Sequence, residues 1–289
     1  VAVGYNALNE MNNSTDNLNT AVGYEAGKKV STGVSNTILG AFAGDAIDAG
    51  TYNVAIGRSA LSTEDAYGYN VAIGAFSLLT QNAADNAFNT AVGYNTGGSI
   101  TTGIRNTIIG GSAGDGITIG ADNVALGYAA LSNPNAGSKS VAIGSAALSA
   151  QVPQFTENAS ALDHDHADET TRRTVTHTAD ARIKVGQIVS SASIFASGTK
   201  IASITDGTHF VIDRDANSSF SSTTVLTFTG GVDGHNTAVG YNAGTATTTG
   251  EKNTLVGSTA GDSLTSGSYS VAVGYAALAT EDTASSSTA

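Results

Sequence analysis

The stretch NTAVGYNAG, residues 236–244, decides the fold, because nearly the same nine residues occur twice before it. They read NTAVGYEAG at residues 19–27 and NTAVGYNTG at residues 89–97. In each copy an apolar residue precedes a glycine, and this pair recurs along the whole chain. A recurrence at a fixed spacing is a strong fold signal in a single sequence and indicates stacked structural repeats.

The apolar–glycine pair marks twelve repeat units. Their glycines are Gly4, Gly23, Gly40, Gly57, Gly74, Gly93, Gly110, Gly127, Gly144, Gly240, Gly257 and Gly274. Successive steps are 19, 17, 17, 17, 19, 17, 17, 17, 96, 17 and 17 residues, so the steps repeat every four units. Four positions after the glycine the residues follow the order Leu, Gly, Gly, Leu three times. The sequence therefore predicts three four-coil modules, with a segment inserted where the third module should have a 19-residue step.

Each unit has the side-chain alternation of a β-strand. In the motif N-[TV]-A-[VI]-G the Thr or Val after the Asn and the Val or Ile before the glycine share one face, and the Ala between them takes the other. The residue before the glycine is Val, Ile or Leu in all twelve units, and we expect it to form a buried column. Gly allows a positive φ at the corners. We therefore predict an all-β fold, a parallel β-solenoid (β-roll) of twelve coils stacked at roughly 4.8 Å.

Asn precedes the strand in most units, and Ser140 and Ser270 are the exceptions. Stacked Asn side chains can pass amide hydrogen bonds from coil to coil. The coil interior is small, with Ala as its commonest inward residue. A single rod would leave aliphatic surface in water, whereas three rods about a common axis would bury it. We therefore expect a homotrimer.

Residues 149–235 differ in composition from the repeats, since they hold all five His and five of the eight Phe residues. After the polar stretch FTENASALDHDHADETTRR, we expect five short strands at 174–178, 183–190, 200–205, 209–213 and 223–228. Asp206-Gly207 predicts a hairpin. The expected organisation is solenoid coils one to nine at 1–148, a small antiparallel β-barrel or sandwich at 149–235 and coils ten to twelve at 236–289.

Composition excludes several classes of partner and site. The chain has 24 acidic and 12 basic residues, and its net charge of −12 argues against nucleic acid. The absence of Cys removes disulfides and sulfur-ligated metals. No apolar run approaches the roughly 18 residues that span a bilayer, so no membrane insertion is expected. The chain begins VAVGYNAL without an initiator Met, which indicates a processed product or a piece of a longer protein.

The candidate sites for chemistry each have a structural alternative. His164 and His166 have metal-like spacing, but a solvated acidic linker explains them better, so we predict no metal and no cofactor. Asp45, Asp115 and Asp262 share one corner position four coils apart, which favours a role in their own turns.

Scattered acids do not form a catalytic pair, so no catalytic residue and no enzyme is predicted. The alternating Val and Thr column argues against ice binding. Six Tyr follow the glycine and either stack on sugars or pack over neighbouring coils: Tyr5, Tyr24, Tyr94, Tyr128, Tyr241 and Tyr275.

The segments NVAIGRSAL, SVAIGSAAL and NTAVGYNAG resemble the head repeats of YadA-like trimeric autotransporter adhesins and the repeats of phage tail-fibre proteins. The period here is longer than the usual adhesin head coil. The resemblance implies a trimeric extracellular fibre on a virion appendage or a cell surface.

Two non-catalytic functions fit the sequence. In the first, the chain is a structural and adhesive fibre segment, with the inserted domain as a lateral contact for a cell-surface glycan or receptor. In the second, it is a subunit of an extracellular filament built by end-to-end stacking. A head-to-tail junction between two copies would have a step of 19 residues, which is one of the chain's own steps.

Overall fold

The computed structural model describes residues 1–12, 17–133, 136–162, 168, 173–180, 182–191, 193–221, 223–283 and 285–289. These residues form strands and turns and no helix. The chain divides into two compact units. Val1–Val152 and Asp233–Ala289 form the first, which we call the solenoid, and Pro153–Val232 form the second, which we call the inserted unit.

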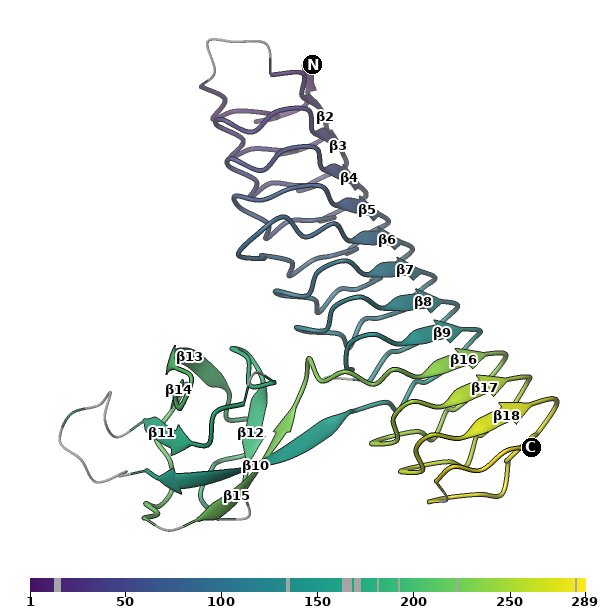
Figure 1. Cartoon of the computed structure of the whole chain (residues 1–289). Coiled ribbons are helices and arrows are strands. Elements are labelled where there is room, and N and C mark those ends of the chain that lie inside the picture. Colours follow the sequence, from purple (N-terminus) through teal and green to yellow (C-terminus); the bar gives the residue numbers. More distant parts are fainter. Residues whose placement is uncertain are drawn as a thin grey trace. The chain divides into compact units, whose positions relative to one another are not determined.

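Twelve short strands form one parallel sheet in the solenoid (Figure 1). They are β1 (Ala2–Val3), β2 (Thr20–Val22), β3 (Thr37–Leu39), β4 (Val54–Ile56), β5 (Val71–Ile73), β6 (Thr90–Val92), β7 (Thr107–Ile109), β8 (Val124–Leu126), β9 (Val141–Ile143), β16 (Thr237–Val239), β17 (Thr254–Val256) and β18 (Val271–Val273). Equivalent residues of successive coils pair in register, as Val54 does with Val71. β9 pairs in the same way with β16, on the far side of the inserted unit in sequence. The predicted all-β parallel solenoid is therefore confirmed.

The glycine after each strand is required by the close stacking of the coils. Gly74 has a φ of +130°, and a Cβ added to it would lie 2.2 Å from the carbonyl oxygen of Gly93 in the next coil. Any other residue would therefore clash with backbone as well as strain the chain.

The middle residue of each strand, and not the residue before the glycine, faces the core. In every solenoid strand after β1 this middle residue is completely buried: Ala21, Ile38, Ala55, Ala72, Ala91, Ile108, Ala125, Ala142, Ala238, Leu255 and Ala272. The residue before the glycine lies on the outer face, where four of the twelve are exposed, such as Leu39 at 46%, and the other eight are half-buried. Ala is thus the commonest inward residue of the strands, as expected, but the prediction of a buried column before the glycine is wrong for the single chain. Since a strand alternates its side chains, this column shares the outer face with the Thr or Val two positions earlier.

The order Leu, Gly, Gly, Leu changes the position from which a coil fills the core. Leu78 and Gly97 occupy the same position in adjacent coils and both have a positive φ, 47° and 59°. Leu78 fills the core itself, whereas the coil of Gly97 fills it with Ile100. A Cβ on Gly97 would lie 3.0 Å from Ile100 Cδ1 and 3.1 Å from Leu78 Cδ2. Most coils therefore place a large aliphatic side chain at one of these two positions. Ile38, Ile108 and Leu255 add a second one from the strands of their own coils, and the coil of Gly244 buries Thr247 instead.

A column of buried Asn residues joins the coils at the corner before each strand. The backbone N–H of Asn106 donates to Oδ1 of Asn89 at 2.8 Å, and Nδ2 of Asn106 donates to the carbonyl of Gly120 at 3.0 Å. The N–H of Asn123 then donates to Oδ1 of Asn106 at 3.1 Å. The predicted Asn column is therefore present, but most of its bonds join side chains to backbone. Direct amide-to-amide bonds join Asn106 to Asn89 and Asn123 to Asn106, both at 3.1 Å.

The inserted unit contains a six-stranded antiparallel sheet with the order β12-β15-β10-β11-β14-β13. Its strands are β10 (Gln154–Ala161), β11 (Thr174–His177), β12 (Ile188–Ser190), β13 (Ile201–Asp206), β14 (His209–Ile212) and β15 (Thr224–Thr229). Val189 N–H donates to the Thr199 carbonyl and Ile201 N–H to the Gln187 carbonyl, both at 2.9 Å, so the two edges of the sheet also meet. Phe210 and Phe228 are completely buried in its core.

The expected strands of this unit were incomplete. The sequence places β10 in a polar stretch, yet it pairs with both β15 and β11. Its polar residues alternate with the buried Phe155 and Ala159, so one face is in the core and the other outside. The hairpin predicted at Asp206-Gly207 is confirmed, because β13 pairs antiparallel with β14.

The assignment of the inward face can be tested in one strand. We expect Ala72→Asp to abolish cooperative folding, because it buries an unpaired charge between coils. Ile73→Asp should leave the circular dichroism spectrum of the solenoid intact, because that side chain points outward. Equal loss of structure in both variants would contradict the assignment.

The Asn column can be tested at Asn106. Asn106→Ala leaves the Asn123 N–H and the Gly120 carbonyl without their partners, and each such buried group costs about 1–3 kcal/mol. Arg105→Ala is the matched control, because Arg105 forms an exposed ion pair with Asp122 at 2.6 Å, and such pairs contribute about 0–1 kcal/mol. Denaturant unfolding should show a clear loss of stability in the first variant only. A loss of similar size in both would contradict a structural role for the column.

Candidate functional site

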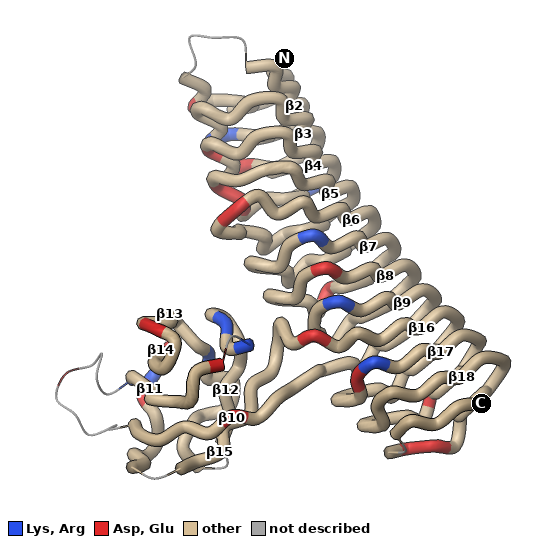
Figure 2. The backbone as a smooth tube through the Cα atoms, viewed as in Figure 1, with Lys and Arg blue, Asp and Glu red and all other residues tan. Residues whose placement is uncertain are grey.

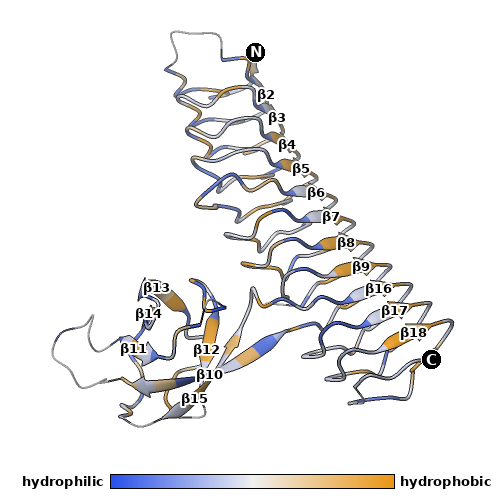
Figure 3. Cartoon of the chain, in the orientation of Figure 1, coloured by the Kyte–Doolittle hydropathy of each residue, from blue (hydrophilic) through white to orange (hydrophobic). Residues whose placement is uncertain are grey.

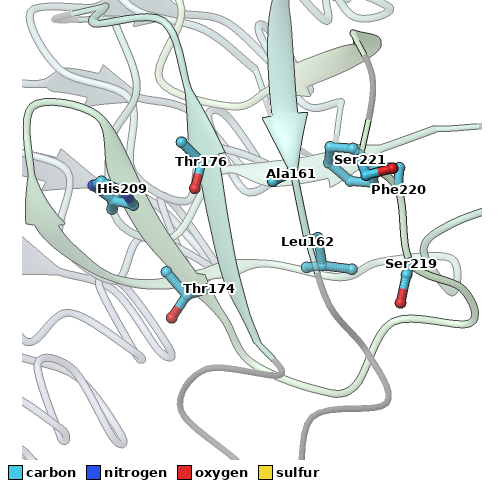
Figure 4. Close-up of a pocket in the computed structure, with 8 residues that line it drawn as sticks. All are labelled: Ala161, Leu162, Thr174, Thr176, His209, Ser219, Phe220 and Ser221. Carbon is cyan, nitrogen blue, oxygen red and sulfur yellow. The ribbon is translucent and has the colours of Figure 1, made fainter.

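The inserted unit carries a pocket of about 640 Å³ (Figure 4). It is lined by Ala161, Leu162, Thr174, Thr176, His209, Ser219, Phe220 and Ser221. Four hydroxyl groups and one imidazole are its polar groups, and Leu162 and Phe220 provide an apolar wall. An apolar cavity with a few polar groups is the usual composition of a small-ligand site.

Strands β11 and β14 build one wall of the pocket. Along β11, Val175 and His177 are buried in the core, whereas Thr174 and Thr176 are half-buried and line the pocket. Thr176 lies directly opposite His209 in the antiparallel pair. The alternation of β11 thus selects which side chains a ligand could reach.

Two backbone hydrogen bonds between Leu162 and Phe220 hold another wall of the pocket. Leu162 N–H donates to the Phe220 carbonyl at 2.8 Å, and Phe220 N–H donates to the Leu162 carbonyl at 2.9 Å. This bridge fixes the segment before β15 beside the end of β10. The pocket therefore joins residues that are far apart in the sequence.

His209 is oriented by Asp206 at the β13–β14 hairpin. Its Nδ1 lies 3.0 Å from both carboxylate oxygens of Asp206. The Asp206 carboxylate also accepts the Thr208 N–H at 2.7 Å, and these hydrogen bonds, with that from His209 as the largest cause, hold the pKa of Asp206 well below its usual range. Because an ionised carboxylate only accepts, Nδ1 of His209 carries the proton in this contact. Nε2 is the ring nitrogen that this contact leaves available.

This pair does not have the arrangement of a hydrolytic triad. In a triad the acid binds one ring nitrogen of the His and the nucleophilic hydroxyl binds the other. Here the Thr208 hydroxyl lies 3.0 Å from Nδ1 of His209, the nitrogen that Asp206 already binds. The arrangement suits recognition of a polar ligand, and the absence of enzymatic activity stays a prediction.

His177 lies on the core side of the same strand pair and was given no role by the sequence. It is 6% exposed, its Nδ1 contacts the Thr178 carbonyl, and its ring lies 5.2 Å from that of Phe210. With Asp180, Ile204 and Asp206 it lines a second pocket of about 390 Å³. The signal that could have identified it as inward-facing is the alternation of TVTH, in which it falls two positions after the buried Val175.

The outer face of the solenoid sheet is uncharged along all twelve strands. Every strand consists of Thr, Val, Ala, Ile or Leu, and Figure 2 shows the charged residues of the solenoid at its corners and turns. In Figure 3, strands that begin with Val, such as β8, β9 and β18, are more hydrophobic than β16 and β17, which begin with Thr. The face is therefore apolar with intervening rows of hydroxyl groups.

The six Tyr that follow the glycines are exposed beside this face. Their exposed fractions run from 47% for Tyr24 to 83% for Tyr275. Tyr5 and Tyr24 stack at 5.2 Å between ring centroids, and Tyr24 meets Phe42 edge-on at 5.3 Å. Some of these Tyr do pack over a neighbouring coil, but each keeps much of its ring in solvent.

Asp45, Asp115 and Asp262 lie in equivalent corners after β3, β7 and β17, four strands apart in the sheet. The structure therefore does not bring them together. In each, Oδ1 is buried and has no hydrogen-bond partner among the described residues. Burial raises the pKa of Asp45 and of Asp115, and backbone hydrogen bonds offset part of that effect. Their role in the turns stays a prediction.

His164 and His166 lie outside the described residues. Across the part of the chain that the structure describes, no three His, Cys, Asp or Glu side chains are grouped so that they could hold a metal ion. The same residues include no apolar helix of membrane-spanning length.

Comparison of the chain with protein-family models, curated proteins and solved structures finds no match. The solenoid face and the pocket of the inserted unit are therefore the basis of the function proposed below.

Proposed function

We propose that the chain is a non-catalytic structural and adhesive segment of an extracellular fibre, resembling the heads of trimeric adhesins and phage tail fibres. In this proposal the solenoid is a rigid spacer that forms a homotrimer in three four-coil modules. The inserted unit presents the contact for a cell-surface glycan or receptor. The observation that carries the proposal is the uncharged outer face of the twelve-stranded sheet.

The size of this face supports its burial in an assembly. With strands about 4.8 Å apart and three residues long, the face is about 58 Å long and about 10 Å wide, roughly 600 Å². The whole face is thus similar in size to the largest apolar patches that monomers leave in water, and the Thr side chains of six strands occupy part of it. The strands carry no charge that would oppose contact with another copy of the same face.

Two different surfaces on each copy favour a closed ring over a pair. A ring needs heterologous contacts, in which one patch of a copy meets another patch of the next. The aliphatic column before the glycine and the exposed Tyr after it supply two such patches on either side of one corner. Three copies about an axis would cover both.

Charges on the outer face should disrupt this assembly without unfolding the chain. We expect the double variant Leu126→Asp and Ile143→Asp to keep its β-sheet spectrum but to fall from the mass of three chains to that of one in light scattering. Ala66→Asp, at an exposed corner, is the control and should keep the parent mass. An unchanged mass in the double variant would contradict the proposed interface.

The pocket of the inserted unit supports the adhesive part of the proposal. Hydroxyl groups and the imidazole of His209 can exchange hydrogen bonds with the hydroxyl groups of a sugar, and Phe220 offers an aromatic surface. This chemistry matches a glycan better than an apolar ligand, because several polar groups need partners when a ligand displaces water.

Filling the pocket should weaken binding to cells or to a glycan array. We expect Thr176→Tyr to reduce binding by about tenfold or more, since a lost contact of 1.4 kcal/mol changes affinity tenfold. Thr156→Tyr makes the same change at an exposed position of β10 outside the pocket and should bind like the parent. Equal binding by both variants would place recognition elsewhere.

The corner that holds the inserted unit resembles a corner that lacks one. Asn236 Nδ2 donates to Gln151 Oε1 at 3.1 Å across the base of the insertion, as Asn89 Nδ2 donates to Gln81 Oε1 at 2.8 Å across a ten-residue loop.

Replacing residues 149–235 by residues 79–88 should therefore leave a folded solenoid of the same oligomeric state that no longer binds. Failure to fold would show that the inserted unit belongs to the core, and retained binding would assign recognition to the solenoid.

The alternative of an end-to-end filament is less well supported. A junction with a 19-residue step requires β18 to pair with β1 of the next copy. That edge of β18 is occupied, because Val271 N–H donates to the Ser287 carbonyl and Val273 N–H donates to the Ala289 carbonyl, both at 2.8 Å.

A further inference from the structure

The buried Asn column loses a bond at Asn70. In the coils of Asn36, Asn106 and Asn123, Nδ2 donates to the carbonyl of the residue fourteen positions later. Nδ2 of Asn70 is buried and has no hydrogen-bond partner. The step from Asn70 to Asn89 is 19 residues instead of 17. The longer corner therefore explains why the usual carbonyl is not in place.

A second unpaired donor lies in the same corner. Gln81 is completely buried, and its Oε1 accepts the bond from Asn89 Nδ2 at 2.8 Å. Its Nε2 is buried without a partner. The backbone N–H of Asn89 in turn donates to Oδ1 of Asn70 at 3.2 Å. Both amides therefore contact Asn89.

The equivalent corner of the third module shows where Gln81 Nε2 points. There Gln151 takes the place of Gln81, and its Nε2 donates to Oγ of Ser140 at 2.8 Å. Ser140 takes the place of Asn70 in the column, and its hydroxyl can accept this bond. At the Asn70 corner the side-chain amide of Asn70 takes the place of that hydroxyl. The unpaired NH2 groups of Asn70 and Gln81 cannot hydrogen-bond to each other, because both only donate.

The repeat also assigns a buried acid to the side of Asn70 that faces the preceding coil, because Gln81 and Gln151 at the equivalent position each contact the Asn of the next coil. Glu64 is seven residues after Gly57, as Gln81 is seven residues after Gly74, and it is completely buried. Its Oε1 accepts the Tyr67 N–H at 3.2 Å. The backbone of Asp65 and Ala83 also lowers the pKa of the carboxyl, but Oε2 is buried and has no partner within hydrogen-bond distance. Asn53 links the two residues, because its Nδ2 donates to the Tyr67 carbonyl at 3.2 Å and its Oδ1 accepts the Asn70 N–H at 3.0 Å.

We propose that Glu64, Asn70 and Gln81 form a buried hydration site that binds one water molecule inside the solenoid. The water oxygen accepts from Asn70 Nδ2 and Gln81 Nε2, and one water hydrogen goes to Glu64 Oε2. All three groups then have partners, and a buried water with about three bonds is a normal part of a protein core. A metal ion does not suit the site, because two of its three groups are N–H donors. An anion does not suit it, because the third is a carboxyl.

Protonation of Glu64 changes the site. Because Oε1 accepts the Tyr67 N–H, the proton lies on Oε2, the atom that accepts the water hydrogen when the carboxyl is ionised. Burial is the main cause that raises the pKa of Glu64 to about 7, and the field of Asp65 adds to it. Asp48 of the preceding coil and Asp85 of the following coil are exposed, as Asp65 is. The folded chain therefore keeps a proton that the unfolded chain loses near its ordinary value of 4.5. The contribution of Glu64 to the free energy of unfolding is therefore fully present below pH 4.5 and is lost as the pH rises to about 7.

A crystal structure at a resolution that shows ordered water tests the site directly. The expected result is one solvent peak within about 2.7–3.2 Å of Asn70 Nδ2, Gln81 Nε2 and Glu64 Oε2. In Asn70→Ser the new hydroxyl should pair with Gln81 as Ser140 does with Gln151, and the peak should be lost or displaced. A map in which both amides bond to protein carbonyls with no solvent between them would overturn the proposal.

Thermal unfolding from pH 5 to pH 8 tests the coupling. The melting temperature of the parent should fall over this range relative to that of Glu64→Gln, which cannot ionise. Glu281→Gln is the matched control, because Glu281 occupies the same position seven residues after Gly274 but is exposed. It should follow the parent. The same pH slope in the parent and in Glu64→Gln would overturn the coupling.

Discussion

The structure depends on one constraint, which is that every coil must close at a corner while its backbone groups stay paired away from water. The buried Asn meets this constraint at the corner before most strands. Its Oδ1 accepts the N–H of the next residue in the column, and its Nδ2 donates to a carbonyl later in its own coil, as at Asn106. Unpaired buried backbone groups are costly. The side chain thus makes bonds that a three-residue strand cannot make beyond its ends.

The remaining features of the solenoid follow from this close stacking. Coils in register bring one backbone so near the next that only Gly fits after the strand, as at Gly74. The space inside is narrow, so the strands contribute mostly Ala and most coils add a larger side chain from the following turn, such as Leu78 or Ile100. A coil with so small a core is stable only between neighbours. The outer face then carries aliphatic side chains that further copies of the chain can cover.

The sequence was sufficient to predict the repeat, the parallel order and the stacking of equivalent residues, because these depend on spacing alone. It could not decide which face of VAI in β5 points inward, since all three residues are apolar and only the width of the core separates Ala72 from Ile73. β10 was missed because half of its residues are polar and its partners β15 and β11 come later in the chain. The pocket could not be predicted either, because it joins Leu162, Thr176 and Phe220 across the sheet. The Asn70 site did have a signal, namely an Asn at a 19-residue step where the third module has Ser140.

The central claim is that the outer face of the sheet is an interface between copies of this chain. A cryo-electron microscopy structure of the protein as it assembles in solution tests it most directly. The account predicts three chains about one axis, with the column from Val3 to Val273 of each copy in contact with its neighbours. A structure in which this column faces solvent, in a monomer or in any other assembly, would contradict it.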